Sequence, residues 1–528
     1  MKKSLLLLVL IGFLAGLYSA PISYSEADGI ARNFVTLRSA KNATLEYDCT
    51  LRHDGLALAF VWKLEPNGYI VVCADDQLPP VLAYSFESPF DDGSSQSAVL
   101  SELIIHDLSL RLQQANPISI AKAQSRWQAL RQMRDDDFIQ YPPAGYSPTG
   151  GWLKSNWTQN SPYNMYCPID PVTSVRSVAG CPSVAMGMIV NFHETLNGTR
   201  LSDLDDYYHS YAGRNYWIDN DYEAHGFASF PQLNTYLDEL NQNYKYQLPI
   251  TNSDKGALVW ASGVACRQVY TSSSSGTFSV SQANQAFIRF GFEGFELLTD
   301  SAPDLYPRMR QNMIDAKPVH LAVVTPAWDM GHNVVVDGYN TDEYYHLNFG
   351  WGGSYNGWYL LPSEIPYGLT VVEGAIVDIN PKSYLFAFPE TLEFLDFEDI
   401  YGAQTVELIN ITSDPIVIED YRFPEFIGLS YWHIDTSPEE LPYTLLPGQS
   451  MFFHVDVDTP TRMETDEIVE EKLRIIHADG AIEILVRFNM GLITSVQDNA
   501  LSMVPMTISA YPNPFAEQIN ISVANAAK

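Results

Sequence analysis

Cysteine and basic residues are the two scarce kinds of side chain in this sequence. The 528 residues include five cysteines, and 30 lysines and arginines stand against 63 aspartates and glutamates, for a formal net charge of −33. A surface this acidic repels phosphate backbones and anionic lipid, so we expect no nucleic-acid partner. No two cysteines form a CxxC pair, which argues against a zinc site, and no metal or organic cofactor is expected.

Apolar runs long enough to cross a membrane are also missing. Lys2 and Lys3 precede an apolar run over residues 5–17, and small residues follow at positions 19 and 20. This order is typical of a secretory signal peptide, and the run is too short to span a bilayer core of about 30 Å. We therefore predict a cleaved signal over residues 1–20, a protein that is secreted or held at the cell surface, and no membrane span.

The odd number of cysteines leaves at least one thiol outside any intramolecular disulfide. A thiol kept unpaired in an oxidising compartment calls for an explanation, and catalysis is one. The sequence does not decide the disulfide state of the other four cysteines, Cys49, Cys73, Cys167 and Cys266.

Length and composition predict three or so globular domains, since 46% of the residues are apolar and 18% are charged. The first, residues 21–145, holds a helical pattern that Ser25 precedes, with Ser25 and Asp28 arranged like a capping box. Two strand patterns, 58–64 and 69–73, follow around a tight turn. Acidic residues and a proline pair at 135–143 close this region. Proteolytic nicking concentrates in exposed stretches of this kind.

Two further changes of composition divide the rest of the chain. Residues 146–382 are rich in Tyr, Trp and Gly, with helical and then strand-like patterns. Residues 383–492 hold short strand patterns separated by turns, which predicts an all-β sandwich of immunoglobulin type. Residues 493–528 are predicted to be a linker followed by one strand, and they contain the run Tyr-Pro-Asn-Pro-Phe at 511–515.

Cys181 stands at the start of an apolar helical pattern. Val184, Met188 and Phe192 are spaced four apart, which is typical of a buried helical face. Pro182 suits the first helical position, so Cys181 is predicted at the N-cap. The positive end of the helix dipole would lower the thiol pKa there. By position alone, an ordinary buried cysteine explains Cys181 equally well.

Two later residues are the partners that a nucleophilic cysteine needs. His332 opens an apolar strand 151 residues after Cys181, and Asn348 follows 16 residues later in a second strand. A turn at 340–343 would join these strands and bring the two side chains together. The chemistry requires a thiolate, an imidazolium that protonates the leaving amine, and an amide that orients the ring. Papain-type enzymes carry the three in this order, with His and Asn about 130–150 residues after Cys.

A fourth element lies upstream. Gln159 precedes Cys181 by 22 residues, in a loop that follows Trp157. Its side-chain amide and the backbone N–H of Cys181 would together form an oxyanion hole. Taken alone, a glutamine in a loop is better explained as an ordinary solvent-exposed side chain.

Four motifs in this order resemble the streptopain family of secreted bacterial cysteine peptidases, a branch of the papain-like fold. The resemblance covers residues 146–381 and, less sharply, residues 22–141, which resemble the family's propeptide. It implies an α+β catalytic domain with a helical half and an antiparallel β half, preceded by an α+β inhibitory propeptide. The matching motifs are Trp157-Thr-Gln159 with Pro162-Tyr-Asn164, Gly180-Cys181, Gly331-His332 with Asp337-Gly338, and Asn348-Phe-Gly-Trp351-Gly-Gly353.

The resemblance also implies a role for each catalytic candidate. Cys181 would be the nucleophile and His332 the base. Asn348 would orient the histidine, and Gln159 would donate to the oxyanion.

Three further residues are implied at the substrate-binding surface. Ser275 lies where the family has a serine-glycine loop that contacts substrate, and Gly331 would offer its backbone to the substrate chain. Trp351 would shield the hydrogen bond between histidine and asparagine from water. The family usually has tryptophan where this chain has Phe349, which predicts altered packing or subsite shape with activity retained.

The remaining cysteines and histidines are weaker candidates for catalytic residues. Cys266 follows a helical apolar pattern and is expected in the core, and Cys167 lies in a turn. His320 and His346 alternate with apolar residues on strands and are predicted to be structural. Asp337 precedes a glycine, where a role in a turn is at least as well supported as one in the active site.

Together these inferences predict a secreted cysteine endopeptidase that acts on proteins or peptides and is made as a zymogen. Its own residues 21–145 would inhibit it until cleavage between 135 and 150. The alternatives are a catalytically inactive papain-like protein that binds or adheres, and an acyl transferase on the same fold. The presence of all four catalytic residue types favours the peptidase. Residues 493–528 resemble the start of a type IX secretion sorting domain, although a proline-rich linker can carry the same motif.

Overall fold

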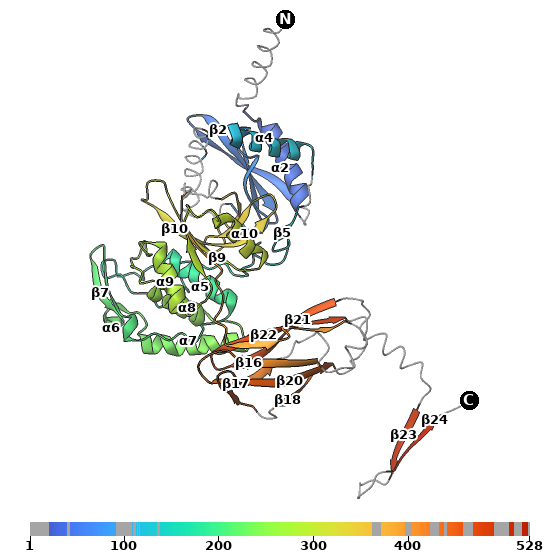
Figure 1. Ribbon diagram of the computed structural model, residues 1–528. Coiled ribbons are helices and arrows are strands. Elements are labelled where there is room, and N and C mark those ends of the chain that lie inside the picture. The colour runs from blue at the N-terminus through green and yellow to red at the C-terminus, as the bar shows by residue number, and fades with distance from the viewer. Residues whose placement is uncertain are drawn as a thin grey trace. The chain divides into compact units, whose positions relative to one another are not determined.

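The structure is a computed structural model of the chain (Figure 1). The predicted signal peptide, the acidic run at 135–137 and positions 512–515 of the tail motif lie outside the described residues. Within the described part, no helix has both the length and the apolar character needed to cross a membrane. The structure describes residues 21–39, 43–90, 108, 112, 115, 117–134, 138–361, 371–395, 404–422, 432–437, 441–457, 468–489, 506–511 and 520–525.

Two compact units divide the chain, residues 1–382 and residues 383–528. The first unit begins with a small α+β region. Its elements are α2 (Tyr24–Arg38), β1 (Thr44–His53), β2 (Leu56–Glu65), β3 (Tyr69–Cys73), β4 (Val81–Ser85), α4 (Pro117–Arg131) and β5 (Gln140–Tyr141).

Helix α2 forms because its apolar residues recur on one face. Ala27, Ile30 and Phe34 are buried, and their spacing of three and four residues is that of an amphipathic helix. Ser23 caps the helix by accepting a hydrogen bond from the backbone N–H of Glu26. The helix therefore begins at Tyr24, and its cap lies two residues before the predicted cap, Ser25.

The predicted hairpin over 58–64 and 69–73 is confirmed as strands β2 and β3, which pair antiparallel with Phe60 opposite Val72. These strands belong to a large sheet that runs on into the second part of the unit. Strand β4 joins the two parts by pairing with β12, with Tyr84 opposite Trp358. The strand order is β1-β2-β3-β4-β12-β11-β10-β9-β13-β8, and β5 also pairs with β10.

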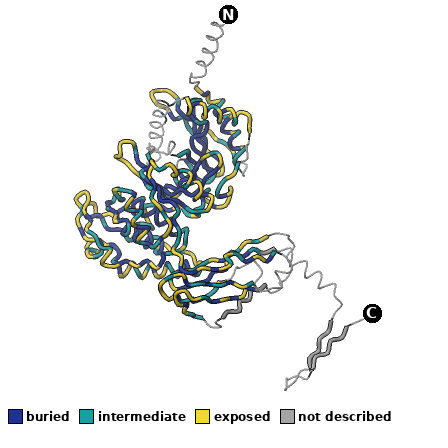
Figure 2. The backbone as a smooth tube through the Cα atoms, viewed as in Figure 1, coloured by how far each residue is buried: buried dark blue, intermediate teal, exposed yellow. Residues whose placement is uncertain are grey.

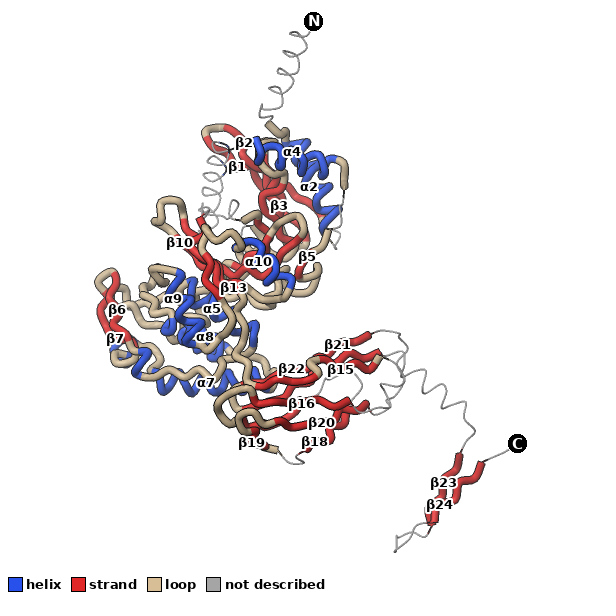
Figure 3. The backbone as a smooth tube through the Cα atoms, in the orientation of Figure 1, coloured by secondary structure: helices blue, strands red, loops and turns tan. Residues whose placement is uncertain are grey.

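The second part of the first unit contains a helical half and a β half (Figure 3). The helices are α5 (Cys181–His193), α6 (Tyr222–His225), α7 (Phe230–Lys245), α8 (Asn252–Ala265), α9 (Val280–Arg289) and α10 (Leu305–Ile314), with a short 3-10 helix, η2 (Asp203–Asp205). The strands are β6 (Tyr207–Tyr211), β7 (Arg214–Ile218), β8 (Glu296–Leu298), β9 (Val319–Val324), β10 (Gly331–Asn340), β11 (Tyr345–Asn348), β12 (Gly357–Tyr359) and β13 (Val371–Val377).

Strand β10 lies between two apolar cores (Figure 2). Val334 and Val336 belong to the core that the β half shares with the N-terminal region. Val335 belongs to the core of the helical half, which is built around α5 and α8. Successive side chains of a strand point to opposite faces, so this alternation decides which residues of β10 face α5.

The second unit is all β. One sheet has the order β14-β16-β20-β18 and the other β15-β22-β21-β17-β19, and residues from both line a single core, as in a β-sandwich. Strands β23 (Met506–Tyr511) and β24 (Asn520–Asn525) pair separately. The sandwich strands are β14 (Leu385–Phe388), β15 (Thr391–Phe394), β16 (Gln404–Asn410), β17 (Ile416–Arg422), β18 (Trp432–Ser437), β19 (Tyr443–Leu445), β20 (Ser450–Val457), β21 (Ile468–His477) and β22 (Gly480–Asn489).

The four cysteines other than Cys181 are either kept apart or buried by the fold. Cys49 on β1 lies opposite Val61 of β2, and Cys73 on β3 lies opposite Ala59 at the other edge of β2, so their Cα atoms are more than about 9–10 Å apart. A disulfide needs less than about 7 Å, which excludes a bond between them. Cys167 and Cys266 are buried thiols, and burial raises the pKa of Cys167 to about 12.

Candidate active site

Cys181 is the first residue of helix α5, and Gly180 is its N-cap. The prediction that Cys181 itself is the N-cap is wrong by one residue. Gly180 takes this place because its φ is +91°, a conformation that side chains rarely adopt. A Cβ at Gly180 would also lie 2.8 Å from Oε1 of Gln268. Glycine here lets the chain turn tightly into the helix and leaves the side of Cys181 open.

The Cys181 thiol is half-buried and accepts a hydrogen bond from Nδ2 of Asn333, 3.8 Å from Sγ. Burial raises the thiol pKa, while hydrogen bonds from Asn333 and from the backbone of Cys181 act in the opposite direction. The predicted lowering of this pKa is therefore wrong for the described state. The loss of solvation outweighs the hydrogen-bond donors.

His332 lies on β10 and is buried. Its Nε2 donates to the carbonyl of Phe349 at 2.8 Å, which assigns the ring proton to that nitrogen. The ring stacks on Trp351 with centroids 4.3 Å apart. Burial lowers the pKa of His332 to about 4, although the Phe349 carbonyl acts against this. In the described state His332 is a neutral ring.

Asn348 is fully buried at the end of β11. The predicted hairpin of these strands is confirmed, and Asn348 pairs with Val335. Its Nδ2 donates to the carbonyl of Ser155 at 3.1 Å, and its Oδ1 accepts from the backbone of Gly350 at 3.1 Å. Because Val335 and His332 are three residues apart, Asn348 and His332 lie on opposite faces of the sheet.

A backbone hydrogen bond places Gln159 near the start of α5. Its carbonyl accepts from the N–H of Ala179 at 2.8 Å, two residues before Cys181. The preceding Trp157 accepts from Gly352 at 2.8 Å, which ties this loop to the glycine-rich segment after β11.

The three predicted substrate-binding residues lie in different surroundings. A Cβ at Gly180 would lie 3.1 Å from the carbonyl carbon of Ser275, so Ser275 is next to the nucleophile segment. Gly331 is exposed at the start of β10. Trp351 stacks on His332 and also on Phe349, with centroids 5.4 Å apart in the latter pair.

The structure thus separates the predicted site into two groups. Gln159 and Ser275 lie near Cys181, whereas Trp351 lies with His332 across strand β10. No hydrogen bond between described residues joins Cys181 to His332 or to Asn348.

The sequence interpretation missed Asn333 and Gln268. Asn333 touches the thiol with its Nδ2, and its Oδ1 accepts from Nε2 of His320 at 2.7 Å. Gln268 is fully buried and donates to the carbonyl of Ala179 at 2.6 Å. The signal for Asn333 was strand alternation, since the neighbour of His332 must point to the other face. His320 therefore orients a residue at the thiol, beyond the packing role predicted for it.

Asp337 and His346 form a separate buried pair on β10 and β11. Asp337 Oδ1 lies 2.6 Å from His346 Nδ1, and both side chains are fully buried. Asp337 Oδ2 also accepts from the N–H of Leu153 at 3.1 Å. The pair anchors the chain that follows the N-terminal region, and Asp337 lies within a strand, so the turn role predicted for it is wrong.

Comparisons with known proteins agree with the arrangement of the chain. Residues 157–359 match the model of the Peptidase C10 family, and residues 19–105 match that of the Spi protease inhibitor. The chain is 24% identical over 373 residues to the thiol protease/hemagglutinin PrtT of Porphyromonas gingivalis, which covers 65% of this chain and 39% of that relative. It is 21% identical over 338 residues to streptopain of Streptococcus pyogenes, covering 60% of this chain and 77% of that relative.

Among solved structures, a Prevotella intermedia prointerpain A fragment with a cysteine-to-alanine mutation matches with 20% identity and a TM-score of 0.45. That match covers 64% of this chain and 100% of the other. The chain thus spans well under half the length of the PrtT relative and about three quarters of streptopain. The chain is similar to the Peptidase C10 family over residues 157–359 and to the Spi protease inhibitor over residues 19–105, and these similarities support a cysteine-type peptidase.

Proposed function

We propose that this chain is an exported endopeptidase made as a zymogen, in which Cys181 attacks the peptide carbonyl and His332 transfers the protons. The placement of Cys181 carries the proposal, because it begins a buried helix beside β10, the strand of His332. Backbone N–H groups at a helix start favour an anionic sulfur once a cation stands beside it.

In this reaction the thiolate of Cys181 adds to the carbonyl carbon, and the imidazolium of His332 protonates the leaving amine. The resulting thioester is then hydrolysed when His332 takes a proton from water. Gln159 and the backbone N–H of Cys181 would hold the oxyanion, and Asn348 would orient the His332 ring. Trp351 would cover the ring, in keeping with the stacking seen in the described state.

We infer that the described geometry is that of the inactive precursor. Side chains of β10 alternate, so Asn333 meets Cys181 while His332 is held on the other face by Phe349 and Trp351. A shift of one residue at the start of the strand would exchange the two side chains. Such a shift would form the reactive pair without rebuilding the rest of the sheet.

Contacts between the N-terminal region and the β10–β11 turn support the inference that this is the inactive precursor. Arg38 pairs with Asp342 at 2.8 Å. Lys122 and Arg126 pair with Glu343 at 2.6 and 2.7 Å. These ion pairs therefore hold the N-terminal region against the turn of the β10–β11 hairpin, which carries the proposed catalytic residues. Such a contact is expected of an intramolecular inhibitor.

Export through a cleaved signal is part of the proposal. The inhibitor match begins at residue 19, and the preceding residues combine two lysines with an apolar run. That order suits a secretory signal.

Self-processing of purified precursor tests the proposal. Wild-type precursor should convert to a shorter form with a new N-terminus between residues 135 and 150, and that form should release amine and acid from a peptide. The Cys181→Ala precursor should stay intact and should be cut at the same site by added mature enzyme.

Three results would overturn it. A Cys181→Ala precursor that matures by itself would exclude Cys181 as the nucleophile of processing. Folded, processed protein without hydrolysis would favour an inactive binding protein. Transfer of the acyl group to an added amine in place of water would favour an acyl transferase.

A further inference from the structure

A serine-rich loop lies directly against the segment that carries Cys181. Its base is closed by two backbone hydrogen bonds between Val269 and Gly276, at 2.9 and 3.0 Å. Thr271 accepts from the N–H of Val178 at 3.1 Å, and Ser275 lies beside Gly180. The loop therefore lies next to the segment that leads into the nucleophile.

The loop has little apolar surface of its own to hold it there. Residues 272–275 are four consecutive serines that are exposed or half-buried, and the buried Thr271 precedes them. Thr271 Oγ1 accepts from the N–H of Ser274 at 2.8 Å, and Ser275 Oγ accepts from the N–H of Thr271 at 3.1 Å. These bonds shape the loop internally, but its position relative to Cys181 requires an external anchor.

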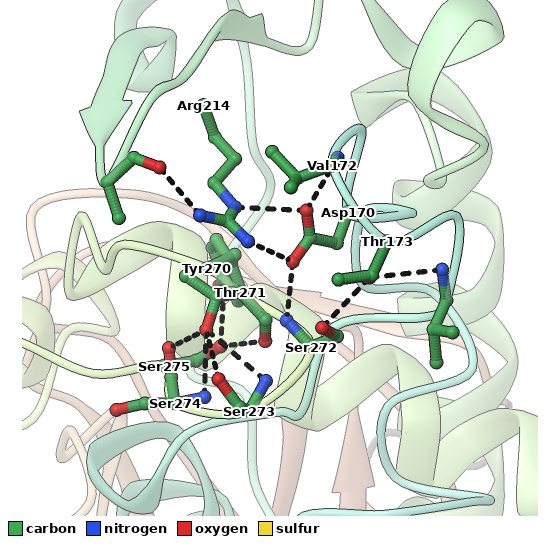
Figure 4. Close-up of polar contacts among 12 residues, drawn as sticks. Asp170, Val172, Thr173, Arg214, Tyr270, Thr271, Ser272, Ser273, Ser274 and Ser275 are labelled. Carbon is green, nitrogen blue, oxygen red and sulfur yellow. Dashed lines mark hydrogen bonds and ion pairs between the residues drawn. The ribbon is translucent and has the colours of Figure 1, made fainter.

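Asp170 is that anchor (Figure 4). Its side chain is fully buried, and its Oδ2 accepts from the N–H of Ser272 at 2.9 Å. Arg214 holds the same carboxylate in a bidentate pair, with Nε at 2.9 Å and Nη2 at 2.8 Å. The N–H of Val172 donates the fourth hydrogen bond at 2.9 Å. Burial opposes the charged form, but these donors outweigh it and hold the pKa of Asp170 far below its usual range.

Arg214 lies on the hairpin of strands β6 and β7. This hairpin also forms hydrogen bonds with the chain just before the loop, at residues 268 and 270. Tyr207 donates to the carbonyl of Gln268 at 2.7 Å, and His209 accepts from the N–H of Tyr270 at 2.7 Å. The contact of Asp170 with Ser272 continues this series. Three separate segments of the chain thus meet at the loop that lies beside Gly180.

We propose that Asp170 and Arg214 are positioning residues for substrate binding, which hold loop 271–275 where it accepts the extended main chain of a peptide. This inference rests on the proposed peptidase function. Serine hydroxyls and backbone groups suit the main chain of a peptide, because they form hydrogen bonds without reading a particular side chain. Since neither residue touches Cys181, their effect should fall on binding of extended substrates and leave the bond-breaking step unchanged.

The test compares Arg214→Gln and Arg214→Lys in the full chain after processing. Arg214→Gln should raise KM for a peptide of six or more residues about tenfold and change kcat less than about twofold. Alkylation of Cys181 by iodoacetamide, which does not reach along the loop, should keep its wild-type rate. Arg214→Lys retains the charge and should recover most of the KM. The matched control is Arg200→Gln, which breaks an exposed ion pair with Asp238 and should match wild type.

An unchanged KM in folded Arg214→Gln would overturn the inference. So would a parallel loss of kcat and of the alkylation rate, because that result would mean a general structural role. If Arg214→Gln does not fold, Thr173→Val serves instead, since it removes the 2.9 Å bond that Thr173 Oγ1 donates to Ser272 Oγ and, besides it, one 3.4 Å bond accepted from the N–H of Val175. Its KM should rise about two- to threefold, and no rise would overturn the inference.

Hydrogen exchange separates this inference from the proposed function. The amide of Ser272 should exchange faster in Arg214→Gln than in wild type, whether or not the wild-type protein cleaves peptides. Unchanged exchange at Ser272 would contradict the anchoring role by itself. Absence of peptide cleavage in the wild type, with faster exchange in the variant, would contradict the peptidase function and leave the anchor in place.

Discussion

The two faces of strand β10 place neighbouring residues in opposite surroundings. Asn333 points toward helix α5 and contacts the Cys181 thiol. His332 points the other way, into the core shared with the N-terminal region, where Trp351 covers it. Position along the chain therefore brings a histidine to the right strand but not to the thiol. The side of the strand decides whether the two proposed partners can react.

Replacing His332 by alanine gives the largest expected contrast between the two faces. Peptide hydrolysis by the processed enzyme should fall by about 10²–10⁴-fold, because proton transfer is lost. Alkylation of Cys181 in the precursor should change less than about twofold, because His332 lies across the strand from the thiol. Equal losses in both measurements would mean that the two residues already touch in the precursor.

Lowering the pH should reduce the free energy of unfolding because the His332 ring is buried. The ring titrates near its ordinary pKa of 6.5 in the unfolded chain but at about 4 in the folded one. Below pH 6.5 the unfolded chain therefore binds a proton that the folded chain does not, so stability falls as pH drops from about 6.5 to 4 and then levels off. The full loss assigned to His332 over this range is about 3 kcal/mol.

Urea unfolding of the Cys181→Ala precursor at pH 7 and pH 4.5 measures this effect, since that variant cannot process itself. Adding His332→Gln should remove about 2 kcal/mol of the difference between the two pH values. His320 and His193, whose pKa values burial also lowers to about 4, remain in both proteins and cancel in the comparison. An identical pH dependence with and without His332 would show that its ring is not buried as described.

Substitution of Asn333 should have a smaller effect, limited to the reactivity of the Cys181 thiol on the opposite face of β10. Its hydrogen bonds lower the pKa of the Cys181 thiol, so Asn333→Ala should raise that pKa and slow alkylation of the precursor about two- to fivefold near pH 7.5. Asn333→Asp should slow it further, because a carboxylate beside the sulfur disfavours the thiolate. Faster alkylation in both variants would mean that Asn333 shields the thiol more than it stabilises its anion.

Local patterns predicted the elements that carry the site. The spacing of Val184, Met188 and Phe192 predicted helix α5, and the two apolar runs around 340–343 predicted the hairpin of β10 and β11. The cap was misplaced by one residue, since Gly180 tolerates the positive φ that the turn requires.

Contacts between distant segments could not be predicted in the same way. Alternation placed His332 and Asn333 on opposite faces, but which face meets α5 depends on how the sheet packs. Asp170 lies in a loop and Arg214, 44 residues later, begins strand β7, and no periodicity links them. The thiol pKa also depends on this packing, because burial opposes the influence of the helix start.

The rate at which Cys181 reacts with a labelled epoxide, compared between precursor and processed enzyme at the same pH, measures whether His332 reaches the thiol only after processing. The processed form should react on the order of 100-fold faster, because only there does an imidazolium stand beside the thiolate. No labelling is expected at this site in Cys181→Ala if Cys181 is the nucleophile and His332 its partner. Equal rates in the two forms, or a label that survives Cys181→Ala, would contradict these expectations.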